Sequence, residues 1–416
     1  MKYQKKNIML LPPTVFPIPA VGGGAVEQLI THLLDINEIE NRAKFIVVSK
    51  YDERAAKIKY HNSDVKYLNQ EGYVIGYEKI FKFMWALYCI WLKVFHNHVI
   101  EKLFLCPHNR MDKYSFQCAI LAKMKQVNFV VNELHDFGND APLAVFNSIV
   151  GSERFYNHIH SVRQEDLNSR RIMNNSISIS EYVRRNWVID PTIQGRNEVL
   201  YNCINVEQFR NSLTTEERME RRKALGVSET DFLVVYSGRL VPEKGVKELL
   251  EAFDMLKAEN KIKLLLIGSA AFSIGNNTVF SEDIIEKARM STNVIPVGYI
   301  PNSQLPGFYA LADAQIIPSI WQEGAGLVAI EGMAAGLPLI ITESGGMPEY
   351  VGEGTAIRIP IDDDVPESIV KAIRQLVHNP DLCSELGEMG QKRAQKFSRE
   401  SYYSNFLEIV DRALGE

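Results

Sequence analysis

Short apolar runs alternate along the chain with longer stretches in which apolar residues recur every three or four positions. Continuous apolar runs rich in Val and Ile are typical of strands buried on both faces of a parallel sheet, and the longer periodic stretches are typical of amphipathic helices. The runs that predict strands are 8–12, 44–49, 128–134, 176–180, 198–202, 232–238, 263–268, 314–319 and 338–344. This alternation predicts an α/β protein built from βαβ units, with doubly wound parallel sheets.

The alternation restarts after a polar, charged segment at 211–231. A fresh apolar run, FLVVYSG, follows that segment directly and opens a second set of βαβ units. We therefore predict two Rossmann-like domains, 1–205 and 206–396, and a chain of 416 residues is long enough for both.

Composition and charge exclude only a few classes of protein. With 46% hydrophobic and 23% charged residues the chain is typical of a soluble globular protein, and a net charge of −5 gives no reason to expect nucleic-acid binding. The N-terminal apolar stretch is too short for a signal peptide and better fits a first buried strand. The scattered cysteines form no CxxC pair and favour reduced, buried thiols in a cytoplasmic protein: Cys89, Cys106, Cys118, Cys203 and Cys383.

The stretch at 77–95 combines apolar and aromatic residues with three lysines, Lys79, Lys82 and Lys93. It is too interrupted to span a membrane. Two interpretations remain open at this point. The stretch is either a core helix of the first domain whose lysines extend to water, or a basic amphipathic helix that lies on an anionic membrane surface.

The first candidate for chemistry is YSGRLVPEKGVKELLEAF, at 236–253. A strand ends at Gly238, a tight turn carries Arg239 and Lys244, and a helix follows. Open α/β sheets bind ligands at the carboxyl ends of their strands, and an Arg and a Lys that converge there suit a diphosphate.

The second candidate is WQEGAGLVAIEGMAAG, at 321–336, in which seven residues separate Glu323 from Glu331. A glycine-containing loop precedes a helix that we expect to begin near Leu327. The amide groups at that helix N-terminus form an anion site, and the glycines allow a phosphate to approach. Glu331, about one turn into the helix, can accept hydrogen bonds from two ribose hydroxyls, and Glu323, in the loop, can accept them from the group that the phosphate carries.

Three further stretches are less specific. Gly22, Gly23 and Gly24 lie between the first strand and an amphipathic helix, where a glycine loop would let an anionic ligand approach the backbone, although the spacing is not GxGxxG. His135 follows a buried strand and could contact a sugar hydroxyl. The acidic run at 361–369 continues into a helical pattern, so we interpret it as a charged helix N-terminus and not as a metal site.

Taken together, these segments resemble the retaining, nucleotide-sugar-dependent glycosyltransferases of family 4, which have the two-Rossmann-domain (GT-B) fold. The similarity extends over nearly the whole chain. It is carried by GRLVPEKG, by PSIWQEGAGLVAIEGMAAGLPLIITESGGMPEYV, by ISISEYVRRNW with VLYNCINVEQF, and by the C-terminal KFSRESYYSNFLEIV.

The resemblance implies a fold in which an acceptor-binding domain and a donor-binding domain face each other across a cleft, with the C-terminal helix at 397–416 crossing back onto the first domain. It implies a catalytic set in which Arg239 and Lys244 neutralise the diphosphate, Glu323 binds the transferred sugar and His135 contacts the donor sugar. The implied donor-binding set is Gly23, Gly24, Gly238, Tyr299, Gly324, Ala325, Gly326, Leu327, Val328 and Glu331, with the backbone at Tyr299 near the nucleotide base.

Two positions depart from the family pattern. Ala325 stands where the family usually has a bulky aromatic residue, and Asn202 is followed by Cys203 where the family usually has Asn-Gly. Neither change removes a charged group, but both bear on the shape of the loop and on the choice of donor sugar.

The expected reaction is transfer of a hexosyl-type sugar from a nucleoside-diphosphate sugar, UDP first among them, to a hydroxyl of a glycan, glycolipid or glycoprotein, in surface polysaccharide or glycoconjugate assembly. No metal or cofactor is expected, because the cations and helix N-termini stabilise the leaving diphosphate. The alternatives are a nucleotide-sugar epimerase or hydrolase on the same fold, and a non-catalytic partner subunit of a transferase. We expect the protein in the cytoplasm, at the inner face of the membrane if 77–95 binds lipid.

Overall fold

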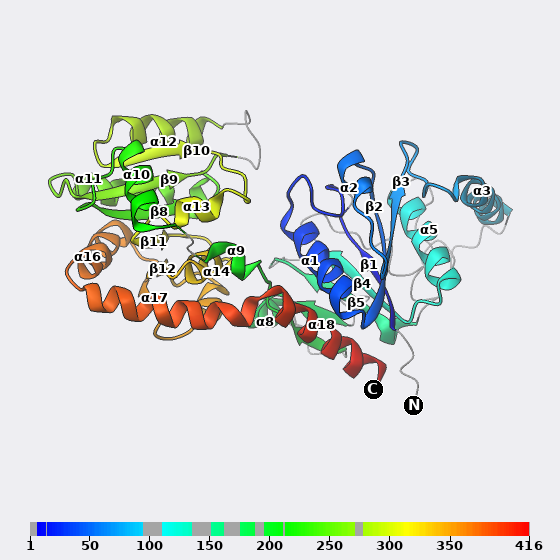
Figure 1. Ribbon diagram of the computed structural model, residues 1–416. Helices are drawn as coiled ribbons and strands as arrows, with labels where there is room; N and C mark the ends of the chain where they lie inside the picture. The colour runs from blue at the N-terminus through cyan, green and yellow to red at the C-terminus, as the bar shows by residue number, and fades with distance from the viewer. Residues whose placement is uncertain are drawn as a thin grey trace. The chain divides into compact units, whose positions relative to one another are not determined.

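The computed structural model describes residues 6–13, 15–94, 110–134, 151–161, 175–187, 195–210, 213–270 and 278–415. The chain divides into two compact units (Figure 1). Unit 1 contains residues 1–200 and 402–416, and unit 2 contains residues 201–401. The sequence places the two boundaries after residues 205 and 396. Each unit is described by itself below.

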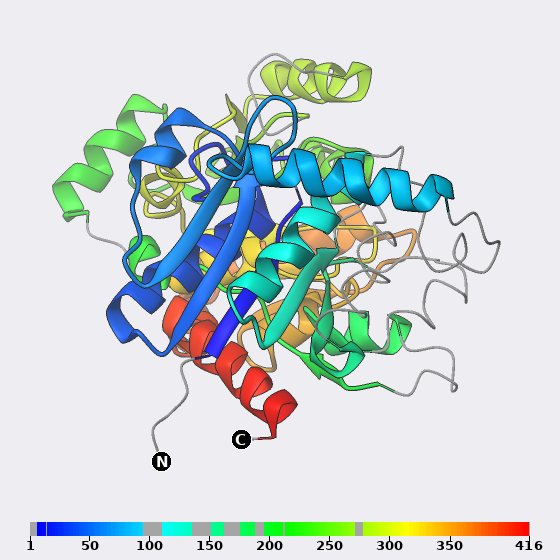
Figure 2. The same cartoon turned by 90° about the vertical axis from the view of Figure 1, so that its right-hand side faces the viewer.

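Unit 1 contains a seven-stranded sheet in the order β3-β2-β1-β4-β5-β6-β7, and every strand pair in it is parallel. Its strands are β1 (Lys6–Leu11), β2 (Ala43–Lys50), β3 (Ser63–Leu68), β4 (Phe129–Leu134), β5 (Phe155–Ile159), β6 (Ser176–Ser178) and β7 (Asn197–Val199). Its described helices are α1 (Ala25–Glu40), α2 (Glu53–Lys57), α3 (Glu78–Val94), α5 (Arg110–Met124), η1 (Ser152–Arg154) and α8 (Glu181–Trp187). Helices cover both faces of the sheet, with α3 lying outermost beside α5 (Figure 2).

Unit 2 contains a six-stranded parallel sheet in the order β10-β9-β8-β11-β12-β13. The strands are β8 (Phe232–Ser237), β9 (Ile262–Ile267), β10 (Val294–Gly298), β11 (Ala314–Ile317), β12 (Leu339–Thr342) and β13 (Ala356–Ile359). The described helices are α9 (Val206–Phe209), α10 (Thr215–Ala224), η2 (Pro242–Lys244), α11 (Val246–Met255), α12 (Val279–Met290), α13 (Leu305–Tyr309), α14 (Leu327–Ala334), α15 (Met347–Val351), α16 (Val365–Val377), α17 (Pro380–Ala394) and η3 (Gln395–Phe397).

Alternate residues of β8 pack into two separate hydrophobic cores of unit 2. Leu233 and Val235 of β8 belong to the cluster that includes α14 and α15, whereas Val234 and Tyr236 belong to the cluster that includes α11 and α16. A strand whose two faces are both covered needs apolar residues at every position, which is why FLVVY has no polar alternation. The predicted class, two parallel α/β Rossmann-like domains, is confirmed.

Four strands were not predicted: β3, β5, β10 and β13. Three of them, β3, β10 and β13, are the edge strands of the two sheets for which the apolar pattern is weakest. An edge strand has a neighbour on one side only and tolerates polar and half-exposed side chains. The fourth, β5, is buried, but it carries Asn157 and His158 and so lacks a continuous apolar run.

The final helix, α18 (Arg399–Leu414), begins in unit 2 and belongs to unit 1 from Tyr402 onward. Within unit 1, Tyr403 and Phe406 pack on Phe45 of β2 with ring centroids 6.5 and 6.1 Å away. The hydroxyl of Tyr403 also donates to the side-chain oxygen of Asn37 on α1, at 2.7 Å. The last residues of the chain are therefore part of the first compact unit.

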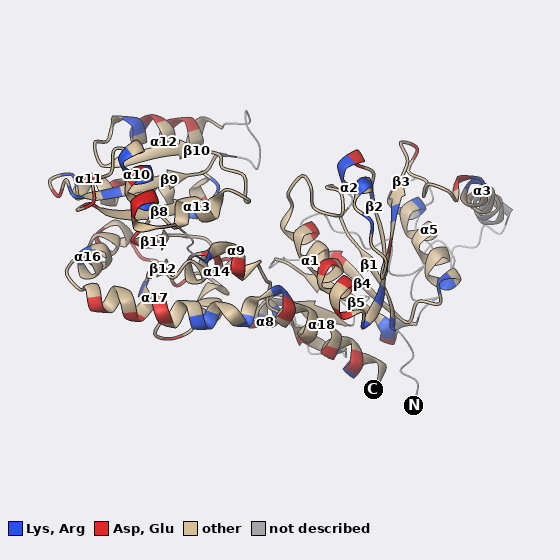
Figure 3. Cartoon of the chain, in the orientation of Figure 1, with Lys and Arg blue, Asp and Glu red and all other residues tan. Residues whose placement is uncertain are grey.

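Charged residues of both signs are interspersed on the helices of each unit (Figure 3). On α10, acids occupy the first turn and bases the last. This separation of charge complements the helix dipole.

Candidate active site

The loop that follows β8 carries the two predicted cations at the carboxyl end of that strand. Arg239 follows Gly238 directly and is half-buried, and Lys244 ends the short helix η2. Gly245 has a φ of 66°, and a Cβ at this position would lie 1.8 Å from the carbonyl oxygen of Pro318, just beyond β11. The glycine therefore lets the β8 loop pack directly on the β11 loop.

This packing brings Lys244 onto Glu323. The Lys244 ammonium and the Glu323 carboxylate form a short ion pair, with the two side chains 26% and 18% exposed. The same carboxylate oxygen, Oε1, accepts a hydrogen bond from Ser319 Oγ at 2.7 Å. Two residues that the sequence places 79 positions apart are thus direct partners, and Ser319, which the sequence analysis did not single out, is their neighbour.

A second loop, between β12 and α15, fixes the backbone of Glu323. The amide of Glu323 donates to Ser344 Oγ at 3.1 Å, and its carbonyl accepts from the amide of Gly346 at 2.7 Å. Gly345 has a φ of 52°, and a Cβ there would lie 2.2 Å from the Glu323 carbonyl oxygen. Three loops, after β8, β11 and β12, therefore meet around this one carboxylate.

Helix α14 begins at Leu327, as predicted, and Gly326 is its N-cap residue. No side chain caps this end of the helix. Ala325, Leu327 and Val328 are partly buried and pack on the core of unit 2. The segment from Gly324 to Val328 thus presents backbone, and not long side chains, beside Glu323, which is the arrangement that an anion site at a helix N-terminus needs.

Glu331 lies one turn further, on the same helix, in a different environment. Its Oε2 accepts a hydrogen bond from the hydroxyl of Tyr309, at 2.9 Å, and Gln315 Nε2 donates to that hydroxyl at 3.1 Å. Burial raises the pKa of Glu331 to about 7, and the hydrogen bond from Tyr309 offsets only part of this effect. The sequence analysis predicted the carboxylate but neither Tyr309 nor Gln315, which belong to α13 and β11.

The remaining predicted residues are less closely tied to this group. Tyr299 follows the edge strand β10 and is half-buried. Gly238 directly follows β8, and an added Cβ there would lie 3.0 Å from the hydroxyl of Tyr236. His135 lies outside the described residues.

The predicted glycine loop of unit 1 leads into α1, and Gly24 is the N-cap residue with a φ of 93°. A Cβ on Gly24 would lie 2.1 Å from Oε2 of Glu27, because the buried Glu27 side chain folds back over the start of its own helix. Burial raises the pKa of Glu27, while hydrogen bonds from the backbone at Glu27 and Phe16 oppose that rise. The helix N-terminus beside Gly23 and Gly24 is thus filled by an acid of the chain itself, a partner that the sequence analysis missed.

A second group that the sequence analysis missed lies in unit 1, where Glu133 of β4 meets His158 and His160. His158 Nδ1 and His160 Nε2 lie 2.9 and 2.8 Å from Oε2 of Glu133. Burial by itself would raise the pKa of Glu133, but the two imidazoles outweigh it and lower that pKa to about 2. The signal in the sequence was His-x-His, whose period of two puts both rings on one face of a strand.

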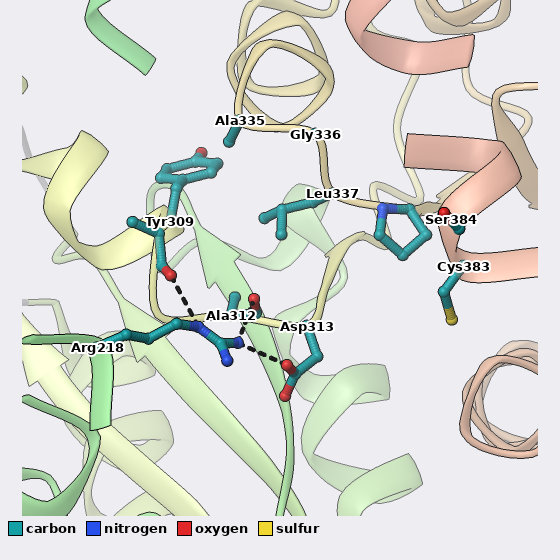
Figure 4. Close-up of a pocket in the computed structure, with 11 residues that line it drawn as sticks. Arg218, Tyr309, Ala312, Asp313, Ala335, Gly336, Leu337, Cys383 and Ser384 are labelled. Atoms are coloured by element: carbon teal, nitrogen blue, oxygen red, sulfur yellow. Dashed lines mark hydrogen bonds and ion pairs between the residues drawn. The ribbon is translucent and has the colours of Figure 1, made fainter. Parts of the chain in front are cut away.

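A cavity of about 410 Å³ opens in unit 2 near the amino ends of β11 and β12 (Figure 4). Its most polar lining residue, Arg218, donates to the carbonyl oxygens of Ala310, Leu311 and Ala312 and pairs with Asp313 at 2.6 Å. The guanidinium of Arg218 therefore binds α10 to the segment that leads into β11. The cavity is therefore separate from the three loops that surround Glu323, which lie at the carboxyl ends of the strands.

With this geometry described, the chain can be compared with known proteins. Residues 217–393, within unit 2, match the sequence model of the family described as Glycosyl transferases group 1. The putative glycosyltransferase EpsD of Bacillus subtilis is 32% identical over 226 residues, which are 54% of this chain and 56% of that protein. The chain thus spans little more than half the length of this relative.

Solved structures extend the similarity of fold to both units. A glycosyltransferase from Rickettsia africae has a TM-score of 0.75 at 17% identity, with 99% of each chain covered. Anabaena HepE in complex with UDP and glucose has a TM-score of 0.65 at 17% identity, over 98% of this chain and 100% of that one. The architecture of two Rossmann-like units is therefore the GT-B fold.

Proposed function

We propose that the protein is a retaining, nucleotide-sugar-dependent glycosyltransferase of family 4, and that unit 2 binds the donor. The observation that carries this proposal is the contact between Lys244 and Glu323, at the point where three loops meet beside the N-terminus of α14. The phosphates of such a donor require a cation and the amide donors of a helix N-terminus. Its sugar hydroxyls require a hydrogen-bond acceptor, which a carboxylate supplies.

Binding of the donor would exchange the partners of this pair. Lys244 and Arg239 would take the diphosphate, together with the amides from Gly324 to Val328. Glu323, released from Lys244, would accept hydrogen bonds from hydroxyls of the transferred sugar. Glu331 would accept hydrogen bonds from hydroxyls of the ribose. The ion pair between Lys244 and Glu323 compensates both charges before this exchange of partners.

In the reaction, the bond between the anomeric carbon and the diphosphate oxygen breaks and its electron pair goes to the diphosphate. The acceptor oxygen forms its bond on the same face, so the anomeric configuration is retained, and its proton passes to the departing diphosphate. The transition state resembles an oxocarbenium ion. The cations and the helix N-terminus stabilise the developing charge on the diphosphate, so the proposed reaction requires no metal.

Unit 1 would bind the acceptor, a hydroxyl of a glycan or of a lipid-linked or protein-linked glycoconjugate, in the assembly of surface polysaccharide or glycoconjugates. UDP is the nucleotide we favour, because HepE, whose fold this chain shares, was solved with UDP and glucose. Ala325 lies in the loop beside Glu323 where the family usually has an aromatic residue, and we propose that this smaller side chain bears on the choice of donor sugar.

A thermal-shift screen of UDP-, GDP- and ADP-sugars tests the donor proposal, because a ligand that binds the folded state raises the melting temperature by mass action. We expect one nucleotide class to raise the melting temperature of the wild type and to lose that effect in Lys244→Ala. A flat response to the whole panel would contradict a donor site in unit 2.

A second proposal concerns α3, for which the sequence left two interpretations open. Phe81 is fully buried and Trp85 packs on Phe116 of α5 with ring centroids 5.4 Å apart, so one side of the helix rests on unit 1. The other side exposes Ile80, Phe83 and Leu87, at 51%, 66% and 50%. An exposed apolar face is not what a core helix with extended lysines would have, and we propose that it lies on an anionic membrane surface.

The lysines contribute less to this argument than the apolar face. Lys79 is exposed, Lys82 also contacts Glu71 at 2.5 Å, and the side chain of Lys93 lies outside the described residues. Among the described helices, none is both long enough and apolar enough to cross a bilayer. Contact with the surface is the proposal, and the cytoplasm is the compartment we propose with it.

Flotation with vesicles that contain anionic lipid tests this proposal. Replacing Ile80, Phe83 and Leu87 together by Ser should abolish flotation, and replacing Lys79 and Lys82 by Glu should weaken it. The matched control replaces Val279 and Met290, which are 87% and 72% exposed on α12 of unit 2, by Ser. Equal flotation of all variants, or none for the wild type, would reject the membrane proposal.

A further inference from the structure

The buried group Glu133, His158 and His160 arises from the register of two neighbouring strands. In the parallel pair β4 and β5, Glu133 lies opposite His158, so the two side chains lie on the same face of the sheet. His160 follows His158 by two positions, just after β5 ends, and lies on that face as well. All three side chains therefore converge near the carboxyl ends of β4 and β5.

These side chains offer three ligand atoms to one point. His158 Nδ1 and His160 Nε2 both face Oε2 of Glu133, the two rings have centroids 4.2 Å apart, and the three ligand atoms all lie within 4.8 Å of one another. The side chains are only 4%, 2% and 7% exposed. A buried carboxylate needs a compensating positive charge, and two imidazoles and a carboxylate are ligands that borderline divalent cations prefer.

We propose that Glu133, His158 and His160 bind a divalent transition metal of the Zn²⁺ class. Two histidines and one glutamate form a three-ligand set that leaves one position of a tetrahedral ion for water. Tetrahedral coordination at about 2.0–2.2 Å separates ligand atoms by roughly 3.3 Å, so the two contacts to Oε2 would lengthen by about half an ångström. Side-chain rotation supplies a change of that size without movement of the strands.

The hydrogen bonding of His158 fits this geometry. The other ring nitrogen of His158, Nε2, is buried without a hydrogen-bond partner, so Nδ1 is the atom through which His158 acts on the group. Ligation through Nδ1 leaves the proton on Nε2, and three bonds to a divalent cation outweigh one unsatisfied N–H. The proposed ion would hold β4 to β5 and takes no part in the donor site of unit 2.

Zn²⁺ titration of the full-length chain, stripped with a chelator and desalted, tests the site without any nucleotide sugar. We expect one site per chain whose affinity falls at least about a hundredfold in His160→Gln and in Glu133→Gln, since loss of even a neighbour of a ligand costs about 10–100-fold. Co²⁺ should give visible absorption bands in the wild type that both variants lose.

The matched control is His61→Gln, because His61 also faces a glutamate, Glu38, at 3.5 Å, but its side chain is 91% exposed. Its Zn²⁺ affinity should equal that of the wild type. Should Glu133→Gln fail to fold by circular dichroism, His160→Gln decides, because it leaves the Glu133–His158 contact in place. A wild type that binds no Zn²⁺, or binding that persists in His160→Gln, would show that the three residues form a hydrogen-bonded network only.

Discussion

Glu323 and Glu331 belong to one short stretch of sequence, yet their surroundings differ. Glu323 lies in a loop, where Lys244 and Ser319 neutralise and orient its carboxylate. Glu331 lies in α14, where burial raises its pKa to about 7 and the hydroxyl of Tyr309 donates a hydrogen bond to it. The first carboxylate is paired with a cation that a ligand can take over, whereas burial favours the protonated form of the second until a ligand offers hydroxyl groups to it.

This difference indicates how one signature can recognise two parts of a donor. Exchange of an ion pair costs little when a diphosphate replaces the carboxylate as the partner of the lysine. A carboxylate whose pKa is close to 7 can bind as an acid or as a base near neutral pH. Substitutions at Lys244, Glu331 and Ser319 should therefore affect transfer to different degrees.

Lys244→Ala should lower sugar transfer at least about a hundredfold, because it removes charge stabilisation of the leaving diphosphate and leaves Glu323 unpaired. Initial rates with the donor found by the screen measure this effect. Lys247→Ala is the matched control: this lysine is exposed on α11 and pairs with Glu251 at 3.6 Å. Equal rates for the two variants would remove Lys244 from the site.

Glu331→Ala should also lower transfer by about a hundredfold or more, and we expect a rise in KM for the donor to accompany the fall in kcat, since the ribose is bound before and during the reaction. Steady-state kinetics over a range of donor concentrations separate the two constants. Glu367→Ala, at an exposed glutamate of α16, serves as the control. Wild-type kinetics in Glu331→Ala would contradict the ribose assignment.

Glu331→Gln should change how stability depends on pH. With a folded-state pKa of about 7 against an ordinary value of 4.5, the folded protein keeps a proton that the unfolded chain loses, so the wild type loses stability as the pH rises from about 4.5 to about 7. The loss amounts to at most on the order of 3 kcal/mol. Denaturant unfolding at pH 5 and pH 8 should show a smaller loss in Glu331→Gln, and parallel losses would disprove the raised pKa.

Ser319→Ala should have the smallest effect, about a tenfold fall in transfer, because one hydrogen bond to a charged acceptor is lost while the Lys244 contact remains. Rates measured beside Ser303→Ala, an exposed serine in the loop before α13, provide the comparison. A fall as large as that of Lys244→Ala would mean that Ser319, and not the lysine, positions Glu323.

The sequence predicted the parts of the molecule whose pattern is local. Continuous apolar runs located β1, β2, β4, β8 and β11, and the glycine loop located the start of α14 at Leu327. The edge strands β3, β10 and β13 escaped because half-exposed strands lack such runs. β5 escaped because it carries Asn157 and His158, whose contacts to Asn132 and Glu133 of β4 no local pattern reveals.

The residues of the candidate site were likewise predictable only where residue type and local spacing identify them. Arg239, Lys244, Glu323 and Glu331 could be chosen by residue type and spacing. Their partners could not, because Ser319 reaches Glu323 only through the fold of the loop that both share, and Tyr309 reaches Glu331 from another helix. In unit 1, the His-x-His pattern is visible in the sequence, but the sequence does not show which residue it contacts. The register of β4 and β5 places Glu133 opposite His158.

The central claim is that Lys244 exchanges Glu323 for the diphosphate of a donor. Isothermal titration calorimetry of the nucleoside diphosphate chosen by the screen, against the wild type and Lys244→Ala, tests it most directly. We predict binding at least about tenfold weaker in the variant, the scale of one charge-assisted contact. Equal dissociation constants for the two proteins would contradict the claim.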